Sequence, residues 1–301
     1  MNPVVNPEIG IVVPVFNRAA SVGVTLDSIL GQTYRPINLV IVDNNSSDAS
    51  RQTVEEWADA HSSNNFRVSV VTESKPGAAA ARNRGLAELD APYVMFFDSD
   101  DVMYPSLVVS AVDEFVKNPD LDLVYWRHVI SGGKRSRFTR TDLLEYHLIH
   151  CLLNTSAYMA RRSTFLNAGG WNESLHVWDD FELGLRVLLT NPKTRGIDRV
   201  LYEVTSHEDS ISGISFSPKR GAWEKTLNVM EREISECNSP EKSRMLKMIE
   251  YRRAILAAHY DRETGDSTVT IPSSLPLRFA YRYTRLGGRG AWSILKLLSL
   301  V

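Results

Sequence analysis

The first third of the chain alternates apolar strands with segments of helical periodicity, and this alternation restricts the fold more than any other feature. The run 9–16 is continuously apolar, as expected for a strand buried on both faces of a parallel sheet. Further strands are expected at 39–42, 67–72 and 93–97, with helices between them at 22–30, 54–61 and 77–89. Repeated strand–helix pairs predict an α/β fold, in which helices cover both faces of a mostly parallel central sheet.

After about residue 119 the pattern becomes less regular. Strands are expected at 121–126, 155–160 and 200–205, and a helix at 177–189. From about residue 219 the sequence is helical. We therefore predict one α/β domain over residues 1–218, with halves of about 9–118 and 119–218, followed by a helical C-terminal extension over residues 219–301.

The overall charge and the cysteines exclude several classes of protein. The formal net charge is −2, so the chain as a whole is not a basic nucleic-acid binder. Cys151 and Cys237 are far apart and form no CxxC spacing, which argues against a disulfide framework or a thiolate zinc site. The apolar run near the start is too short for a signal-peptide core or a membrane span. These features predict a cytoplasmic protein.

Polar side chains follow the predicted strands at the points where the strands end. Asn17 follows the first strand, Asp43 the second, and Asp98 and Asp100 the fourth. In an open parallel sheet, ligands bind outside the carboxyl ends of the strands. The agreement between position and residue type therefore predicts a ligand site at this edge of the sheet.

The triplet Asp98, Ser99 and Asp100 is the first candidate for chemistry. In an extended segment the two carboxylates point to the same side and repel each other unless a cation lies between them. Hard oxygen ligands suit Mg²⁺ or Mn²⁺, which are often shared with substrate phosphates. The alternative is an acidic turn that caps the helix expected near Ser106.

Gly77 begins the Ala-rich helix, whose free amides would attract a phosphate group. A plain glycine at a loop-to-helix junction is the alternative. The sequence contains no GxxxxGK[ST] segment and no GxGxxG after the first strand, which argues against a P-loop NTPase and a dinucleotide site.

A third candidate is the acidic segment that contains Asp179 and Asp180. Acids at a helix start can simply favour the helix dipole. The functional alternative is a carboxylate base that faces an acceptor.

Taken together, these segments make the chain resemble family 2 of the glycosyltransferases, which have the GT-A fold, over residues 9–207. The matching pieces are 13–18 (VPVFNR), 42–48 (VDNNSSD), Gly77 with 81–85 (ARNRG), 97–101 (FDSDD), and 169–173 (GGWNE) before Asp179 and Asp180. Each piece alone is weak, but five in order at family-like spacing are specific.

The resemblance implies a nucleotide site in the first half of the domain. Pro14 and Phe16 would line the base pocket, with Phe16 against the nucleobase, and Asp43 would accept a hydrogen bond from the base. Gly77 and Arg82 would belong to the loop and helix that contact the nucleotide.

The resemblance also implies a metal site. Asp98 and Ser99 would lie near the ribose or the metal, and Asp100 would bind the Mn²⁺ or Mg²⁺ that bridges the diphosphate. His207 resembles a histidine that often follows the acceptor region and would be a further metal ligand, with a structural role as its alternative.

Asp180 matches the catalytic base of the family. The family usually has Glu-Asp at this place, so Asp179 is the alternative base. The implied reaction is a single displacement with inversion at the anomeric carbon. Processive members carry a Gln-x-x-Arg-Trp motif and membrane spans, which this sequence lacks, so we expect one sugar to be added per encounter.

The resemblance thus predicts a metal-dependent enzyme that uses a nucleoside-diphosphate sugar, with UDP favoured, and a carbohydrate or lipid-linked acceptor. Assembly of surface polysaccharide or glycolipid is the expected setting. One alternative is a sugar-phosphate nucleotidyltransferase, which would normally have a Gly-rich basic loop where this chain has PVFNR at 14–18. The other is a non-catalytic protein that binds nucleotide sugars.

The tail 270–301 mixes arginines and a lysine with aromatic and aliphatic residues, and it contains no Asp or Glu. This composition suits the surface of an anionic membrane, which would make the protein peripheral on the inner face. Packing on the catalytic domain or on a second subunit, as in a homodimer, is the alternative.

Overall fold

The computed structural model describes residues 6–205, 220–265 and 274–298. Contacts divide the chain into two units, one of residues 1–141 with 152–206, and the other of residues 142–151 with 207–301. The domain boundary that we predict near residue 218 stays a prediction.

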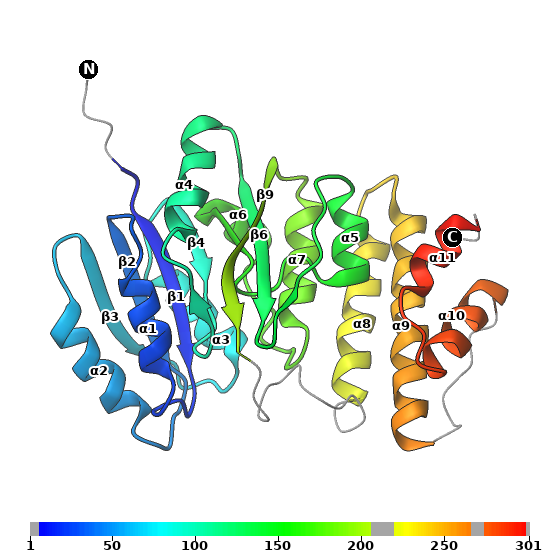
Figure 1. Ribbon diagram of the computed structural model, residues 1–301, viewed down its shortest axis with the longest axis horizontal. Coiled ribbons are helices and arrows are strands. Elements are labelled where there is room, and N and C mark those ends of the chain that lie inside the picture. Colours follow the sequence, from blue (N-terminus) through cyan, green and yellow to red (C-terminus); the bar gives the residue numbers. More distant parts are fainter. Residues whose placement is uncertain (1–5, 206–219, 266–273, 299–301) are drawn as a thin grey trace. The chain divides into compact units, whose positions relative to one another are not determined.

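The first unit is built on a single sheet, which has nine strands within the described residues. Four parallel strands, in the order β3, β2, β1, β4, form one half of the sheet (Figure 1). Their bounds are Ile9–Val15 for β1, Ile37–Asp43 for β2, Phe66–Thr72 for β3 and Tyr93–Phe96 for β4. These are the four strands expected from the apolar runs.

The other half of the sheet is mixed. β8 (Tyr158–Arg161) runs antiparallel to β4, and β6 (Leu123–Ile130) runs antiparallel to β8. β9 (Thr194–Val204) is parallel to β6, and the short strand β5 (Val102–Met103) pairs antiparallel with its end. The two-residue strand β7 (Lys134–Arg135) pairs with β6.

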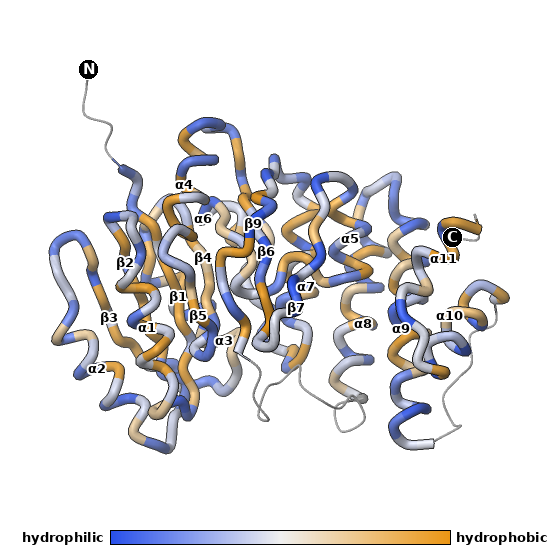
Figure 2. Tube along the Cα trace, viewed as in Figure 1, coloured by the Kyte–Doolittle hydropathy of each residue, from blue (hydrophilic) through white to orange (hydrophobic). Residues whose placement is uncertain are grey.

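Helices cover both faces of the sheet. The odd-numbered residues of β1 share one core with α1 (Val22–Leu30), α2 (Ser50–His61) and α4 (Leu107–Lys117). On the opposite face Val12 meets α3 (Ala78–Ala87), where a methyl group added at Gly85 would lie 2.3 Å from Cγ1 of Val12. Figure 2 shows these strands as largely hydrophobic, as a sheet buried on both faces requires.

Two more helices, α6 (Arg162–Asn167) and α7 (Asp179–Leu189), belong to the same unit. Phe96 of β4 packs edge-to-face on Phe165 of α6 and on Trp171, with 5.0 Å between ring centroids in both pairs. The expected α/β fold with a mostly parallel sheet and helices on both faces is confirmed.

The second unit is helical throughout its described residues. It contains α5 (Leu143–His150), α8 (Arg220–Glu236), α9 (Lys242–Thr264), α10 (Leu275–Arg285) and α11 (Ala291–Leu297). The long helix α9 contacts α5, α8 and α10. The expected helical C-terminal extension is therefore present. Among the described residues, none of the helices combines the length and hydropathy needed to cross a bilayer.

Candidate functional site

The carboxyl ends of β1, β2 and β4 meet at one edge of the sheet, and the loops that follow them are tied together. Asn17, in a left-handed conformation with φ 51°, accepts a 2.8 Å hydrogen bond at Oδ1 from the amide of Ser47. The amide of Arg18 donates to Oγ of Ser50 over 2.6 Å. The Asn-Ser-rich segment after β2 thus shapes the loop after β1.

Asp43 lies at the end of β2 with its side chain buried, and its Oδ1 has no hydrogen-bond partner in the described part of the chain. A buried carboxylate oxygen without a donor is costly, and such groups in native proteins call for an explanation. Phe16, directly after β1, is 57% exposed. Val15 is the register partner of Asp43, so an exposed ring and an unused acceptor lie at neighbouring strand ends.

Gly77 is placed by Asn44. The side-chain amide of Asn44 donates to the carbonyls of Glu73 and Lys75, each over 2.8 Å, and its Oδ1 accepts from the amide of Gly77 over 2.8 Å. Gly77 precedes α3 with φ 125° and ψ 142°, a conformation essentially restricted to glycine. The amide of Gly77 is therefore occupied, so any phosphate contact at this helix start falls to the amides that follow it.

Three carboxylates are crowded after β4. Asp98 and Asp100 are half-buried, while Asp101 and Ser99 are buried. Burial, and then the charges of Asp98 and Asp100, raise the pKa of Asp101 to about 8. Burial also raises the pKa of Asp98 above its ordinary value, with Asp100 adding to the effect and Arg82 opposing it. Asp100 forms a 3.5 Å ion pair with Arg18.

Arg82 of α3 joins this acidic group to α7. Its side chain is 7% exposed; Nη2 lies 2.9 Å from Oδ1 of Asp98, and Nη1 lies 2.7 Å from Oδ2 of Asp179. The guanidinium also lies over the ring of Trp171, 4.3 Å from its centroid. Burial alone would lower the pKa of Arg82, but attraction to Asp179 and Asp98 raises it above the ordinary value, so the cation is permanent.

Asp180 stands beside this bridge in the first turn of α7. Burial raises the pKa of Asp180 to about 7, with the charges of Asp179 and Asp98 adding to the effect and Arg82 opposing it. Its Oδ1 accepts from the amide of Phe181 over 2.8 Å. Of the other acids at this helix start, Glu182 is buried and pairs with Arg186 over 2.7 Å, which gives it a structural role.

The loop before α7 is held by Asn83, the neighbour of Arg82. Oδ1 of Asn83 accepts from the amide of Trp171 over 2.8 Å, and Nδ2 donates to Oε1 of Glu173 over 2.7 Å. A side chain at Gly170 would place its Cβ 2.8 Å from Oδ1 of Asn83, which explains the glycine. The segments 81–85 and 169–173, which were identified in the sequence only by their resemblance to the family, therefore contact each other.

Several residues at the site were not among the candidates from the sequence. Oδ2 of Asp101 accepts from Oγ of Ser156 over 3.1 Å, and Tyr202 donates to Oδ1 of Asn154 over 2.7 Å. The pKa of Tyr202 is raised well above its ordinary value by burial and then by Asp101 and Asp98. Asp101 could have been proposed from the sequence, because it directly follows the triplet 98–100. No sequence pattern indicates a role for Ser156 or Tyr202.

The structure thus brings Arg82, Asp98, Asp100, Asp179 and Asp180 together. His207 lies outside the described residues. Within those residues, no group of three or more His, Cys, Asp or Glu side chains is arranged to hold a metal ion. Nevertheless, Asp98 and Asp100 are hard oxygen donors whose mutual repulsion a divalent cation would relieve, and Mg²⁺ usually binds through one or two carboxylates plus substrate phosphates. The two carboxylates therefore fit such an ion.

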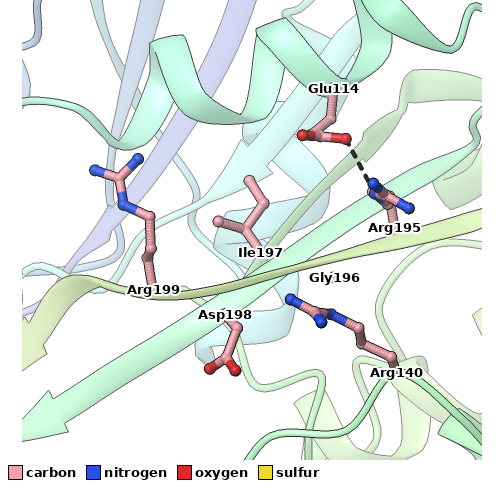
Figure 3. Close-up of a pocket in the computed structure, with 7 residues that line it drawn as sticks. All are labelled: Glu114, Arg140, Arg195, Gly196, Ile197, Asp198 and Arg199. Carbon is pink, nitrogen blue, oxygen red and sulfur yellow. Dashed lines mark hydrogen bonds and ion pairs between the residues drawn. The ribbon is translucent and has the colours of Figure 1, made fainter.

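A separate hollow of about 400 Å³ lies over the first half of β9 (Figure 3). Arg195 in this hollow pairs with Glu114 of α4 over 3.1 Å, and Asp198 pairs with Arg127 over 2.9 Å. None of the predicted site residues lines it; the lining residues are Glu114, Arg140, Arg195, Gly196, Ile197, Asp198 and Arg199. Because it shares no residue with the candidate site, we assign it no role.

Comparison with known sequences adds to this geometry. The profile of the family described as "Glycosyl transferase family 2" matches residues 10–177. The UDP-Glc:alpha-D-GlcNAc-diphosphoundecaprenol beta-1,3-glucosyltransferase WfgD of Escherichia coli is 29% identical over 233 residues, which are 75% of this chain and 88% of that protein. Other curated relatives are longer, and the chain spans only 50–65% of the length of four of them and 13% of a fifth.

Solved structures show the same fold. TarS 1–349 from S. aureus in complex with UDP-GlcNAc has a TM-score of 0.66 at 16% identity, covering 93% of this chain and 92% of that chain. The mannosyltransferase PcManGT from Pyrobaculum calidifontis, in complex with GDP-Man and Mn²⁺, has a TM-score of 0.64 at 16% identity, covering 99% of this chain and 81% of that chain. The expected GT-A fold is therefore confirmed.

Proposed function

The chain belongs to glycosyl transferase family 2, and from this premise we propose that it moves a sugar from a nucleoside-diphosphate donor to an acceptor hydroxyl, with inversion at the anomeric carbon. The observation that carries the proposal is the bridge made by Arg82, which links the acids after β4 to the acids that begin α7. In this proposal, the carboxylates after β4 would hold a metal ion that binds the donor diphosphate, and a carboxylate of α7 would act on the acceptor.

The donor end is proposed at Phe16, Asp43 and the Gly77 loop. The exposed ring of Phe16 is suited to stack on a nucleobase, and the unpartnered Oδ1 of Asp43 is suited to accept from a base N–H. Pro14, in β1 before Phe16, would form the wall of this pocket. UDP is favoured because the names of WfgD and of the TarS complex both contain a UDP-sugar, although PcManGT was solved with GDP-Man.

Asp180 is proposed as the general base. Asp179 is engaged by Arg82, whereas Asp180 has a pKa raised to about 7, near the pH at which a base is most effective. The acceptor oxygen would form its bond to the anomeric carbon while the bond from that carbon to the diphosphate oxygen breaks. The electron pair leaves with the nucleoside diphosphate, and the hydroxyl proton passes to Asp180.

Asp100 and Asp98 are proposed as the protein ligands of Mn²⁺ or Mg²⁺, with Ser99 between them and His207 as a further candidate ligand. A divalent cation bound there would offset the charge that develops on the departing nucleoside diphosphate. Support comes from the crowding of these carboxylates and from the Mn²⁺ named in the PcManGT complex.

The acceptor is proposed to be a carbohydrate, and more specifically one carried on a lipid, because the name of WfgD specifies a diphosphoundecaprenol-linked acceptor. Such a reaction would serve surface polysaccharide or glycolipid assembly, with one sugar added per encounter. Release of a nucleoside diphosphate, rather than pyrophosphate, distinguishes this reaction from that of a sugar-phosphate nucleotidyltransferase. Turnover itself distinguishes it from a non-catalytic protein that binds nucleotide sugars.

The test is the substitution Asp180→Asn, compared with Asp113→Asn at an exposed position of α4. Loss of a general base should lower kcat by about 10²–10⁴-fold. Binding of the donor, measured by calorimetry, should stay unchanged. Near-wild-type release of nucleoside diphosphate by Asp180→Asn, with donor binding intact, would reject the assignment.

A further inference from the structure

Apolar side chains that are exposed to solvent concentrate in the last helices of the second unit. Of the nine large apolar side chains found exposed among the described residues, five lie between residues 275 and 298: Leu275, Phe279, Leu286, Leu297 and Leu298. Leu275 is 79% exposed and Leu286 is 87% exposed. Single exposed apolar residues need no explanation, whereas several on one face of a helix are typical of an interaction surface.

Exposed apolar residues of α10 and of the position directly after it form an ordered face. At about 100° per residue, Leu275 and Phe279 of α10, together with Leu286, which follows the last residue of the helix, fall within an arc of about 40°. Arg278 and Arg282 lie along one border of this apolar stripe, and both are exposed. We call these five residues the α10 face. An apolar stripe with arginines along its border is typical of helices that lie in the headgroup region of a bilayer.

The opposite side of α10 anchors the helix and fixes the direction of the α10 face. Ala280, Tyr281 and Thr284 are buried, and α10 contacts α9. Asp261 of α9 accepts a hydrogen bond from Tyr281 and lies 2.6 Å from Nε of Arg285. The α10 face is therefore presented on a fixed support, which reduces the entropy lost when it docks.

The charge of this surface selects among partners. No Asp or Glu occurs from residue 267 to residue 301, and Arg282 forms no ion pair within the described part of the chain. A two-fold interface with a second copy would set the same face against itself, so that arginine meets arginine. Anionic headgroups would instead pair with the guanidinium of Arg282, while Leu275, Phe279 and Leu286 enter the acyl boundary.

We propose that the α10 face docks the protein on an anionic lipid surface. The transfer reaction proposed above is not needed for this inference. The α10 face would hold the protein where a lipid-borne acceptor is presented.

The experiment is flotation of the full-length protein with vesicles of phosphatidylcholine that either contain or lack phosphatidylglycerol. The test variant is Arg282→Glu with Leu286→Ser, and the matched control is Lys117→Glu with Val116→Ser, where Val116 is 54% exposed on α4. Each variant replaces one cation with glutamate and one exposed apolar side chain with serine. Thermal unfolding that matches the wild type will show that each is folded.

The wild type and the control should float with anionic vesicles, and binding should fall in high salt because the electrostatic part is screened. Removing one arginine should weaken partition about fivefold, and reversing its charge should weaken it further. The proposal is overturned if the wild type does not float with anionic vesicles, or if the test variant floats with them as well as the control does. It is also overturned if light scattering shows a wild-type dimer that the test variant dissociates.

Donor binding separates this proposal from the preceding one. The test variant should bind UDP in solution as the wild type does, because no residue of the candidate site is changed. Loss of vesicle binding with UDP binding intact supports the lipid surface. A wild type that binds vesicles but no nucleotide would instead remove the transferase proposal and leave the lipid surface standing.

Discussion

Arg82 and Asp179 form an ion pair across the candidate site, with 2.7 Å between Nη1 and Oδ2, although they are 97 positions apart in the sequence. The other terminal nitrogen of Arg82 holds Asp98 over 2.9 Å. One side chain therefore fixes the spacing between the acids after β4 and the start of α7. Because the guanidinium is planar and donates in two directions at once, lysine cannot replace it.

Replacing Arg82 with methionine should cost about 3 kcal/mol of unfolding free energy, mainly because the largely enclosed carboxylate of Asp179 loses its partner, while the half-buried carboxylate of Asp98 is partly solvated. Chemical denaturation followed by circular dichroism measures this loss. Arg84→Met is the control, since Arg84 lies on the same helix in an exposed pair with Glu88 and should change stability by less than about 0.5 kcal/mol. Similar losses in the two variants would contradict a bridging role for Arg82.

The pH dependence of the reaction should report Asp180. A base acts only when deprotonated, so kcat/KM should fall as pH drops through the raised pKa of about 7. Burial is the main cause of the raised pKa of Asp180, and the charge of Asp179 adds to it; in Asp179→Asn that charge is gone, while the attraction of Arg82 remains. The acidic limb of the kcat/KM profile should therefore move to lower pH. A limb that stays in place, or moves upward, would show that another group titrates.

Metal removal should abolish turnover if Asp98 and Asp100 hold a cation. Excess EDTA should stop release of nucleoside diphosphate, and added Mn²⁺ or Mg²⁺ should restore it. Asp100→Asn removes one charged ligand and should raise the Mn²⁺ concentration for half-maximal turnover at least about tenfold, since hard cations prefer carboxylate oxygens. Asp113→Asn should leave the titration unchanged. Full activity in EDTA would exclude the metal role.

Donor binding should depend on Phe16. Stacking of a base on an aromatic ring contributes about 1–3 kcal/mol, so Phe16→Ala should weaken UDP binding roughly tenfold or more in calorimetry. The side chain is 57% exposed, so folding should be unaffected. Val24→Ala, at a position 61% exposed on α1, provides the comparison. Unchanged affinity in Phe16→Ala would place the base elsewhere.

Local patterns predicted much of the first half of the fold. The apolar runs at 9–16 and 93–97 correspond to Ile9–Val15 and Tyr93–Phe96, because a strand buried on both faces leaves a continuous hydrophobic signature. The helix expected at 177–189 is Asp179–Leu189. In contrast, β9 begins at Thr194, six residues before the strand expected at 200–205. The sequence pattern missed this first part of the strand because most of its residues are polar and at least partly exposed. The two-residue strands β5 and β7 are too short to leave a pattern.

The sequence by itself determined which chemical groups stand at the strand ends and which motifs accompany them, since strand periodicity and residue type are local properties. Only the tertiary structure decided that Arg82 joins Asp98 to Asp179 and that Asn83 holds the Trp171 loop. It also showed that the charge of Asp98 helps to raise the pKa of both Asp101 and Tyr202. Electrostatic coupling depends on distance and burial, and both arise only when segments far apart in the chain pack together.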